Sequence, residues 1–201
     1  MTQVFLNYRV ADEPFGVAML DQALSERFGS KAVFLASKSI PLGAEWRRQM
    51  YQAVADSTAL LVIMGRNWVE AKDGQGRRAL DDPDDFVRNE ILLAFQLEKQ
   101  VIPVRLGVSR VPAERLPDEL RRLLDCQDIE VRFRSAQIDI DRLANKLREQ
   151  IPALRAAGPA AGPVKAEAFK GNVVQAGHVG QVFQSEQMTF NGDFHAGPRF
   201  G

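Results

Sequence analysis

An uninterrupted apolar segment, ALLVIMG at residues 59–65, constrains the fold most strongly. A strand with one face in water alternates apolar and polar side chains, whereas a strand covered on both faces is apolar throughout. Strands of the second kind are typical of parallel sheets that carry helices on both faces. Four further segments are predicted to be strands, at residues 3–9, 31–37, 100–106 and 129–133.

Helical segments are predicted between these strands. The first, at residues 14–29, has apolar side chains at helical spacing and ends at Gly29, a common helix stop. The others are predicted at residues 44–57, 85–99, 116–125 and 139–151. This alternation predicts an α/β, flavodoxin-like fold, with a five-stranded parallel sheet, right-handed crossovers and helices on both faces. Ligands of such sheets bind beyond the carboxyl ends of the strands, so we expect a site in the loops there.

Composition excludes several classes of partner and site. The 26 basic and 26 acidic residues cancel, so no overall field attracts the chain to nucleic acid or membrane. The single cysteine, Cys126, excludes an internal disulfide and suits a reducing compartment. The start, MTQVFLNYRV, lacks the pattern of a secretion signal, and no apolar run approaches the roughly 20 residues of a membrane span. We therefore expect a cytoplasmic protein with no nucleic-acid or membrane partner.

The chain divides into three regions. Residues 1–151 form the predicted α/β domain. Residues 152–170, PALRAAGPAAGPVKAEAFK, are rich in Ala, Gly and Pro without an apolar period, which indicates a linker. Residues 171–201 form a tail with few charges and two short β-prone pieces. A tail this small cannot bury a core of its own, so we expect it to be disordered alone or to fold against copies of itself.

Glu90 falls on an unexpected face of the predicted helix 85–99. At about 100° per residue it lies within the apolar arc, with Phe86 one turn before it and Leu93 nearly one turn after. Burying an unpaired carboxylate is costly. Glu90 must therefore reach solvent, pair with a cation such as a nearby Arg, or line a cleft. The aspartates that precede the helix favour its macrodipole, and Asp82 or Asp84 could cap its first turn.

The order of several motifs resembles the Toll/interleukin-1 receptor (TIR) domain of the bacterial type. These motifs are VFLNYRVAD, VFLASKSIPLGAEW, ALLVIMGRNW, DDFVRNEILLAF and VIPVRL, within residues 3–150. The aromatic-x-x-x-Glu motif of the family is matched by Phe86 and Glu90. In TIR domains that cleave NAD+, this glutamate is catalytic. The resemblance thus implies that Glu90 stabilises an oxocarbenium-like ribose, with Phe86 stacked on a ring of the substrate.

Arg9 and Tyr8 match the Tyr-Arg pair that ends the first strand of the family. A guanidinium suits phosphate geometry, so Arg9 could meet the pyrophosphate of NAD+. A salt bridge from Arg9 to Asp12 or Glu13 is the equal alternative. Tyr8 is a further candidate contact to the substrate, although packing is the favoured role for it.

Three more residues are candidates for substrate binding. Trp46 begins the helix after the second strand and could form a wall of the cleft, but it shares a stripe with Met50 and Val54, which favours packing. Ser37 and Ser39 could contact a ribose, a weak signal because serine is common in loops.

The resemblance also implies self-association. The BB loop of the family is matched by Ile40, Pro41, Leu42 and Gly43. In enzymatic members this loop completes the site of a neighbouring TIR domain, which implies a homo-oligomer on activation. NAD+ would be the substrate, and no resident cofactor is expected. Two alternatives stay open, a non-enzymatic adaptor that nucleates partner TIR domains and a cyclase that makes a cyclic ADP-ribose signal from NAD+.

The tail resembles the short amyloid-signalling motifs, of the RHIM type, at the ends of bacterial immune effectors. The matching residues are Asn172, Val173, Val174, Gln175, Gly177, Val179, Gly180 and Val182. FNGDFHAG at residues 190–197 would be a second arm. Nearly uncharged, β-prone segments with Gln and Asn can stack in register; a disordered tail with a marginal hairpin is the alternative. The resemblance implies an effector of antiphage immunity, assembled by a sensor protein that bears a similar motif.

Other chemistries lack a signature. The chain has no phosphate loop, no metal-ligand spacing and no dinucleotide glycine fingerprint. Cys126 has no histidine in its domain to activate it, so a thiol nucleophile is not expected. The two histidines, His178 and His195, belong to the β-prone tail, and we do not expect a metal site there.

Overall fold

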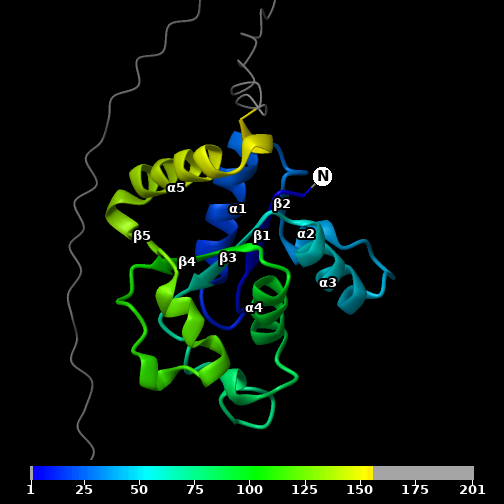
Figure 1. Ribbon diagram of the computed structural model, residues 1–201, viewed down its shortest axis with the longest axis vertical. Coiled ribbons are helices and arrows are strands. Elements are labelled where there is room, and N and C mark those ends of the chain that lie inside the picture. The colour runs from blue at the N-terminus through cyan, green and yellow to red at the C-terminus, as the bar shows by residue number, and fades with distance from the viewer. Residues whose placement is uncertain (1, 156–201) are drawn as a thin grey trace, which may run out of the picture. The chain divides into compact units, whose positions relative to one another are not determined.

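The computed structural model describes residues 2–155 and contains the predicted sheet (Figure 1). The strands are β1 (Val4–Asn7), β2 (Val33–Phe34), β3 (Ala59–Met64), β4 (Gln100–Leu106) and β5 (Ile129–Val131). They are all parallel and lie in the order β2-β1-β3-β4-β5. The predicted α/β fold with a five-stranded parallel sheet is confirmed. The predicted tail motif and the linker beyond residue 155 lie outside the described residues.

Helices cover both faces of the sheet (Figure 1). The α-helices are α1 (Pro14–Phe28), α2 (Ala36–Ser39), α3 (Trp46–Asp56), α4 (Phe86–Gln96) and α5 (Ala136–Gln150). Short 3₁₀ helices are η1 (Ala79–Asp81), η2 (Ala113–Arg115), η3 (Asp118–Asp125), η4 (Phe133–Ser135) and η5 (Pro152–Leu154). Residues of α1 and α5 pack on one face of the sheet, and residues of α3 and α4 pack on the other.

Two predicted elements differ from the structure. The second strand was expected at residues 31–37, but β2 has two residues and the chain turns into α2 directly after Leu35. The hydroxyl of Ser39 accepts a hydrogen bond of 3.2 Å from the Leu35 N–H, which satisfies a backbone donor at the start of this short helix. The predicted helix 116–125 is the 3₁₀ helix η3 and begins at Asp118, because Pro117 precedes it in an extended conformation.

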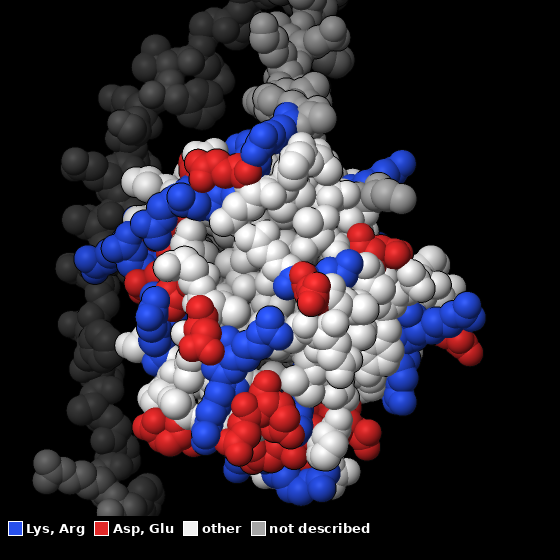
Figure 2. Space-filling view, viewed as in Figure 1, with Lys and Arg blue, Asp and Glu red and all other residues white. Residues whose placement is uncertain are grey.

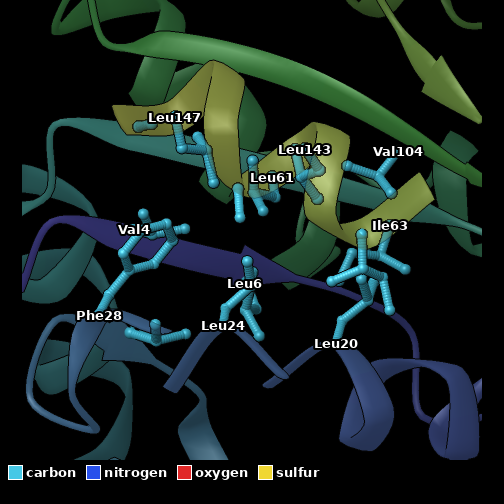
Figure 3. Packing of buried hydrophobic residues seen from close by; sticks show 14 of the residues in the cluster. Val4, Leu6, Leu20, Leu24, Phe28, Leu61, Ile63, Val104, Leu143 and Leu147 are labelled. Carbon is cyan, nitrogen blue, oxygen red and sulfur yellow. The ribbon is translucent and has the colours of Figure 1, made fainter. Parts of the chain in front are cut away.

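Strand β3 is buried on both faces, as its composition predicts. Leu61 and Ile63 contribute to a core with residues of α1 and α5, shown in Figure 3. Leu60 and Val62 contribute to a second core with residues of α3 and α4. Successive side chains of a strand point to opposite faces, so one apolar run supplies both cores. The central strand β3 thus holds α3 and α4 on one face of the sheet.

Asp12 ties together two loops at the carboxyl edge of the sheet. Its carboxylate accepts backbone hydrogen bonds from Gly65 N–H at 2.6 Å and from Asn67 N–H at 2.7 Å. Gly65 permits this close approach, since a Cβ atom there would lie 2.0 Å from Cγ of Glu13. The loop after β1 is therefore held on the loop after β3.

The surface carries basic and acidic side chains next to each other, as Figure 2 shows for one face. Many of these form ion pairs, such as Arg27 with Asp141 and Arg105 with Asp128. This intermixing agrees with the balanced composition of the chain.

We expect Asp12→Ala to lower the free energy of unfolding by about 2 kcal/mol, because two backbone donors lose a charged acceptor. Urea unfolding of the purified protein measures this. Asp125→Ala is the matched control, since Asp125 is exposed and should change stability by less than about 0.5 kcal/mol. An equal loss in both variants would show that Asp12 does not hold the two loops together.

Candidate functional site

Glu90 lies in α4 against the carboxyl end of β1 and is only 2% exposed. The side-chain amide of Asn7, the last residue of β1, donates a hydrogen bond of 2.8 Å to Oε2 of Glu90. The same amide nitrogen donates to the carbonyl of Val87 at 3.0 Å. The predicted position of Glu90 within the apolar arc is confirmed. The alternative of an edge glutamate paired with Arg is wrong, because the partner of Glu90 is the neutral Asn7.

The environment keeps the Glu90 carboxyl protonated. Burial raises its pKa from 4.5 to about 8, and the negative charge of Asp85 acts in the same direction. The hydrogen bond from Asn7 and the positive charge of Arg9 act in the opposite direction but do not outweigh burial. Near neutral pH the resting side chain is therefore mainly the neutral acid. A carboxyl with a strongly shifted pKa at the carboxyl edge of a parallel sheet is a candidate catalytic group.

Asp85 caps α4 and holds Arg9. Its carboxylate accepts the Arg88 N–H at 2.8 Å and binds both terminal nitrogens of Arg9, at 2.7 and 2.8 Å. The predicted cap at Asp82 or Asp84 is therefore wrong. Asp82 instead accepts the Asp84 N–H within the turn around Pro83.

The predicted salt-bridge partner of Arg9 is also wrong. Sequence reasoning offered the pyrophosphate of a substrate or a salt bridge to Asp12 or Glu13, whereas the structure pairs Arg9 with Asp85. Arg9 is 8% exposed, and its positive charge is paired with the carboxylate of Asp85 that caps α4.

An aromatic pair covers the first turn of α4. The rings of Trp46 and Phe86 meet edge to face, with centroids 4.5 Å apart. Trp46 is 47% exposed, so it packs on Phe86 at the surface, whereas Val54 further along its helix is fully buried. The guanidinium of Arg47 lies over the Phe86 ring, 4.9 Å from its centroid. The structure thus brings together Trp46, Phe86 and the helix that carries Glu90.

Other predicted residues lie elsewhere. Tyr8 packs against the core formed by α1 and α5, on the face of the sheet opposite α4. Ser37 is exposed, and the hydroxyl of Ser39 is engaged by the Leu35 N–H. The structure therefore does not bring Tyr8 to Glu90, and whether the serines contact a ligand stays a prediction.

The BB-loop match projects from the domain. Ile40 packs against the core, whereas Pro41, Leu42 and Gly43 are exposed, and Leu42 is fully so. Gly43 has a φ of +79°, a conformation that favours glycine. An apolar side chain at the tip of an exposed loop is suited to contact another protein surface.

The two residues that sequence reasoning missed are Asn7 and Asp85. The alternation of side chains along β1 could have indicated Asn7, because it places Asn7 and Arg9 on one face and Tyr8 on the other. No comparable pattern points to Asp85 rather than its neighbours as the cap.

Two surface hollows lie away from this site. One of about 720 Å³ runs along α5 and the start of β4, and one of about 510 Å³ lies between β2 and the end of α3. Neither is lined by Glu90 or by the aromatic pair. Glu90 itself is 2% exposed, so its carboxyl is closed off from solvent in the single chain.

Within residues 2–155, no group of His, Cys, Asp and Glu side chains is arranged to hold a metal ion. In the same part of the chain, no helix combines the length and the apolar composition needed to cross a membrane.

Three solved structures that match this chain share little sequence with it. The metazoan TIR-STING receptor from C. gigas, solved with 2′,3′-cGAMP, is 16% identical with a TM-score of 0.47, over 69% of this chain and 38% of that one. The TIR domains of the activated Roq1 resistosome, which recognises the pathogen effector XopQ, are 17% identical with a TM-score of 0.45, over 79% and 86%. The TIR domain of the Toll-related receptor TRR-2 from Hydra magnipapillata is 16% identical with a TM-score of 0.43, over 77% and 99%. The chain spans 38% of the length of the TIR-STING receptor, about two fifths.

The family of the chain follows from a family model built on sequences rather than from these structures. None of the curated protein sequences matches this chain. The model of the TIR domain (TIR_2) matches residues 4–150, which include the whole sheet and the residues around Glu90. The chain therefore belongs to the TIR domain family.

Proposed function

We propose that this chain is a TIR-domain NAD+ glycohydrolase, an effector of bacterial antiphage immunity that cleaves NAD+ to nicotinamide and ADP-ribose when it assembles. The observation that carries the proposal is Glu90, a carboxyl 2% exposed and held by Asn7 one turn after the aromatic Phe86. A buried carboxyl without a cationic partner costs stability. A catalytic role gives a reason for that cost.

The proposed reaction needs few groups. The bond between C1′ of the ribose and the nicotinamide nitrogen breaks, and its electron pair neutralises the pyridinium, which leaves as neutral nicotinamide. An ionised Glu90 would stabilise the positive charge that develops on the ribose. The oxygen of water then bonds to C1′, and its proton passes to Glu90 or to solvent. The aromatic pair of Trp46 and Phe86 offers a surface on which a ring could stack.

The raised pKa of Glu90 is compatible with this role. In the single chain burial raises the pKa to about 8, so most of the carboxyl is neutral at pH 7. The nicotinamide ring of NAD+ carries a positive charge, and a cation beside a carboxyl lowers its pKa. Binding of the substrate would therefore favour the ionised form that the reaction needs.

The closed site supports activation by assembly. Access to Glu90 requires the side chains over α4 to move, and the fully exposed Leu42 gives a neighbouring domain an apolar contact. By analogy with the enzymatic members of the family, the BB loop of one domain would complete the site of the next. The tail, with a sensor protein that bears a similar motif, would raise the local concentration of the domains.

A non-enzymatic adaptor is the second candidate. The same closed site and exposed Leu42 favour it, because a scaffold needs the loop but not the carboxylate. A cyclase that makes a cyclic form of ADP-ribose would use Glu90 as the hydrolase does, so the products of NAD+ must separate these two.

We expect Glu90→Gln to lower the rate of nicotinamide release from NAD+ by at least about a hundredfold, because an amide cannot stabilise the developing positive charge. Chromatography of products from concentrated, assembled protein measures this and separates ADP-ribose, a cyclic product and no loss. Glu98→Gln is the matched control, since Glu98 is exposed and lies two residues beyond the last residue of α4. A parental rate in Glu90→Gln would remove Glu90 from the mechanism. No NAD+ loss by the parent would favour the adaptor.

We expect the chain cut after residue 155 to lose NAD+ cleavage at low micromolar concentration, because its domains are no longer gathered by the tail. Rates of the full and the cut chain at equal concentration measure this. An unrelated oligomerising helix joined to residue 155 should restore activity to the cut chain. A cut chain as active as the full one would show that the tail does not assemble the enzyme.

We expect kcat/KM for NAD+ to rise with pH through a midpoint near pH 8 and to level off above about pH 9. The free enzyme needs the ionised carboxylate, and burial raises the pKa of Glu90 to about 8, so the active form is lost as pH falls below that value. The apparent pKa in kcat should be lower, because bound NAD+ carries a positive charge. Sedimentation at each pH verifies equal assembly. A flat kcat/KM from pH 6 to 9 would contradict the raised pKa.

A further inference from the structure

Arg47 is an exposed cation at the aromatic pair. Its guanidinium carbon lies 4.9 Å from the centroid of the Phe86 ring and 5.9 Å from that of Trp46. It stands in the first turn of α3, which begins at Trp46. Figure 2 shows basic side chains that project at the right-hand edge, where α3 and the loop before it lie.

The positive charge of Arg47 is not paired with an acidic side chain within the described part of the chain. Arg47 takes part in none of the ion pairs found within residues 2–155. Other cations of the carboxyl edge and of α4 differ from it, because Arg9, Lys38 and Arg88 are each held by an acidic side chain. Arg66 is also free of ion pairs in this part of the chain, but no contact joins it to the aromatic pair.

We propose that Arg47 binds the pyrophosphate of the dinucleotide substrate. The identity of that substrate rests on the proposed function. A ring stacked on Phe86 or Trp46 is joined through its ribose to the phosphates, which places them within reach of a guanidinium that already lies over the same rings. The planar guanidinium matches two phosphate oxygens at once. Backbone N–H groups at the start of α3 favour the same negative charge.

This assignment replaces Arg9, which sequence reasoning had offered for the pyrophosphate. Both terminal nitrogens of Arg9 are bound to Asp85, and the side chain is 8% exposed. To reach a phosphate, Arg9 would have to give up two charge-assisted hydrogen bonds to the part-buried carboxylate of Asp85, which is unfavourable. Arg47 needs no such exchange, because its side chain is exposed and lies over rings rather than against a carboxylate.

A structural role for Arg47 is the alternative. A guanidinium over an aromatic ring can stabilise the packing of α3 on α4 without any ligand. The two roles differ in what they predict, since a packing residue affects turnover and stability, whereas a phosphate-binding residue affects affinity for anions.

The test compares Arg47→Met with Arg48→Met in the full chain. Methionine keeps an unbranched apolar stem and removes the charge, and Arg48 is the adjacent arginine, which is also exposed. We expect Arg47→Met to raise KM for NAD+ about tenfold and to keep kcat within about twofold, since one charge-assisted contact is lost. The inhibition constant of inorganic pyrophosphate should rise with KM. Arg48→Met should change neither.

A binding measurement makes the result independent of turnover. Trp46 is half-exposed and the other tryptophan, Trp68, is fully buried, so tryptophan fluorescence can report ADP-ribose at the aromatic pair. We expect Arg47→Met to weaken ADP-ribose binding about tenfold and to leave binding of adenosine, which has no phosphate, unchanged.

The outcomes separate this inference from the proposed function. If the parent binds ADP-ribose through Arg47 but cleaves no NAD+, the hydrolase is wrong and the anion site stands. If the parent cleaves NAD+ and both variants behave alike, or if Arg47→Met lowers kcat with KM unchanged, the anion site is overturned. A parent that binds no ADP-ribose overturns it as well.

Discussion

Polar side chains hold α4 on β1 in an interface that is otherwise apolar. Asn7 binds the Val87 carbonyl and Glu90, and Arg9 binds both oxygens of Asp85. Both terminal nitrogens of Arg9 bind Asp85, and loss of either partner would leave the other charge without its partner. The first turn of α4 is therefore fixed in position and direction by β1. The place of Glu90, and of the aromatic ring one turn before it, depends on these contacts.

The fold could be predicted from the sequence because its main signal is local. A strand that is apolar at every position, such as β3, must be covered on both faces, and the spacing of apolar residues identified α1, α4 and α5. The errors occur where a short-range polar contact changes the chain path. The hydroxyl of Ser39 favours the turn α2 where a longer strand was expected. Asp118–Asp125 form a 3₁₀ helix, which the same apolar spacing cannot distinguish from an α-helix.

The candidate site could be predicted only in part. Helical periodicity placed Glu90 in the apolar arc, and the structure confirms its burial. Its partner and the partner of Arg9 could not be found in this way, because Asn7 and Arg9 reach residues 83 and 76 positions away. Contacts of that kind depend on how β1 and α4 pack, and no repeat along the sequence records them.

The packing that stabilises α4 also determines which ligands suit the site. Burial raises the pKa of Glu90. Ionising it in the single chain would place a buried negative charge beside the neutral amide of Asn7. A ligand that brings a positive charge to Glu90 offsets that cost, whereas an uncharged ligand of the same shape leaves it in full. Under the proposed function, entry of the cationic ring of NAD+ and ionisation of Glu90 would therefore be coupled. This coupling is the physical reason why the proposed function pairs Glu90 with a substrate whose reacting ring is cationic.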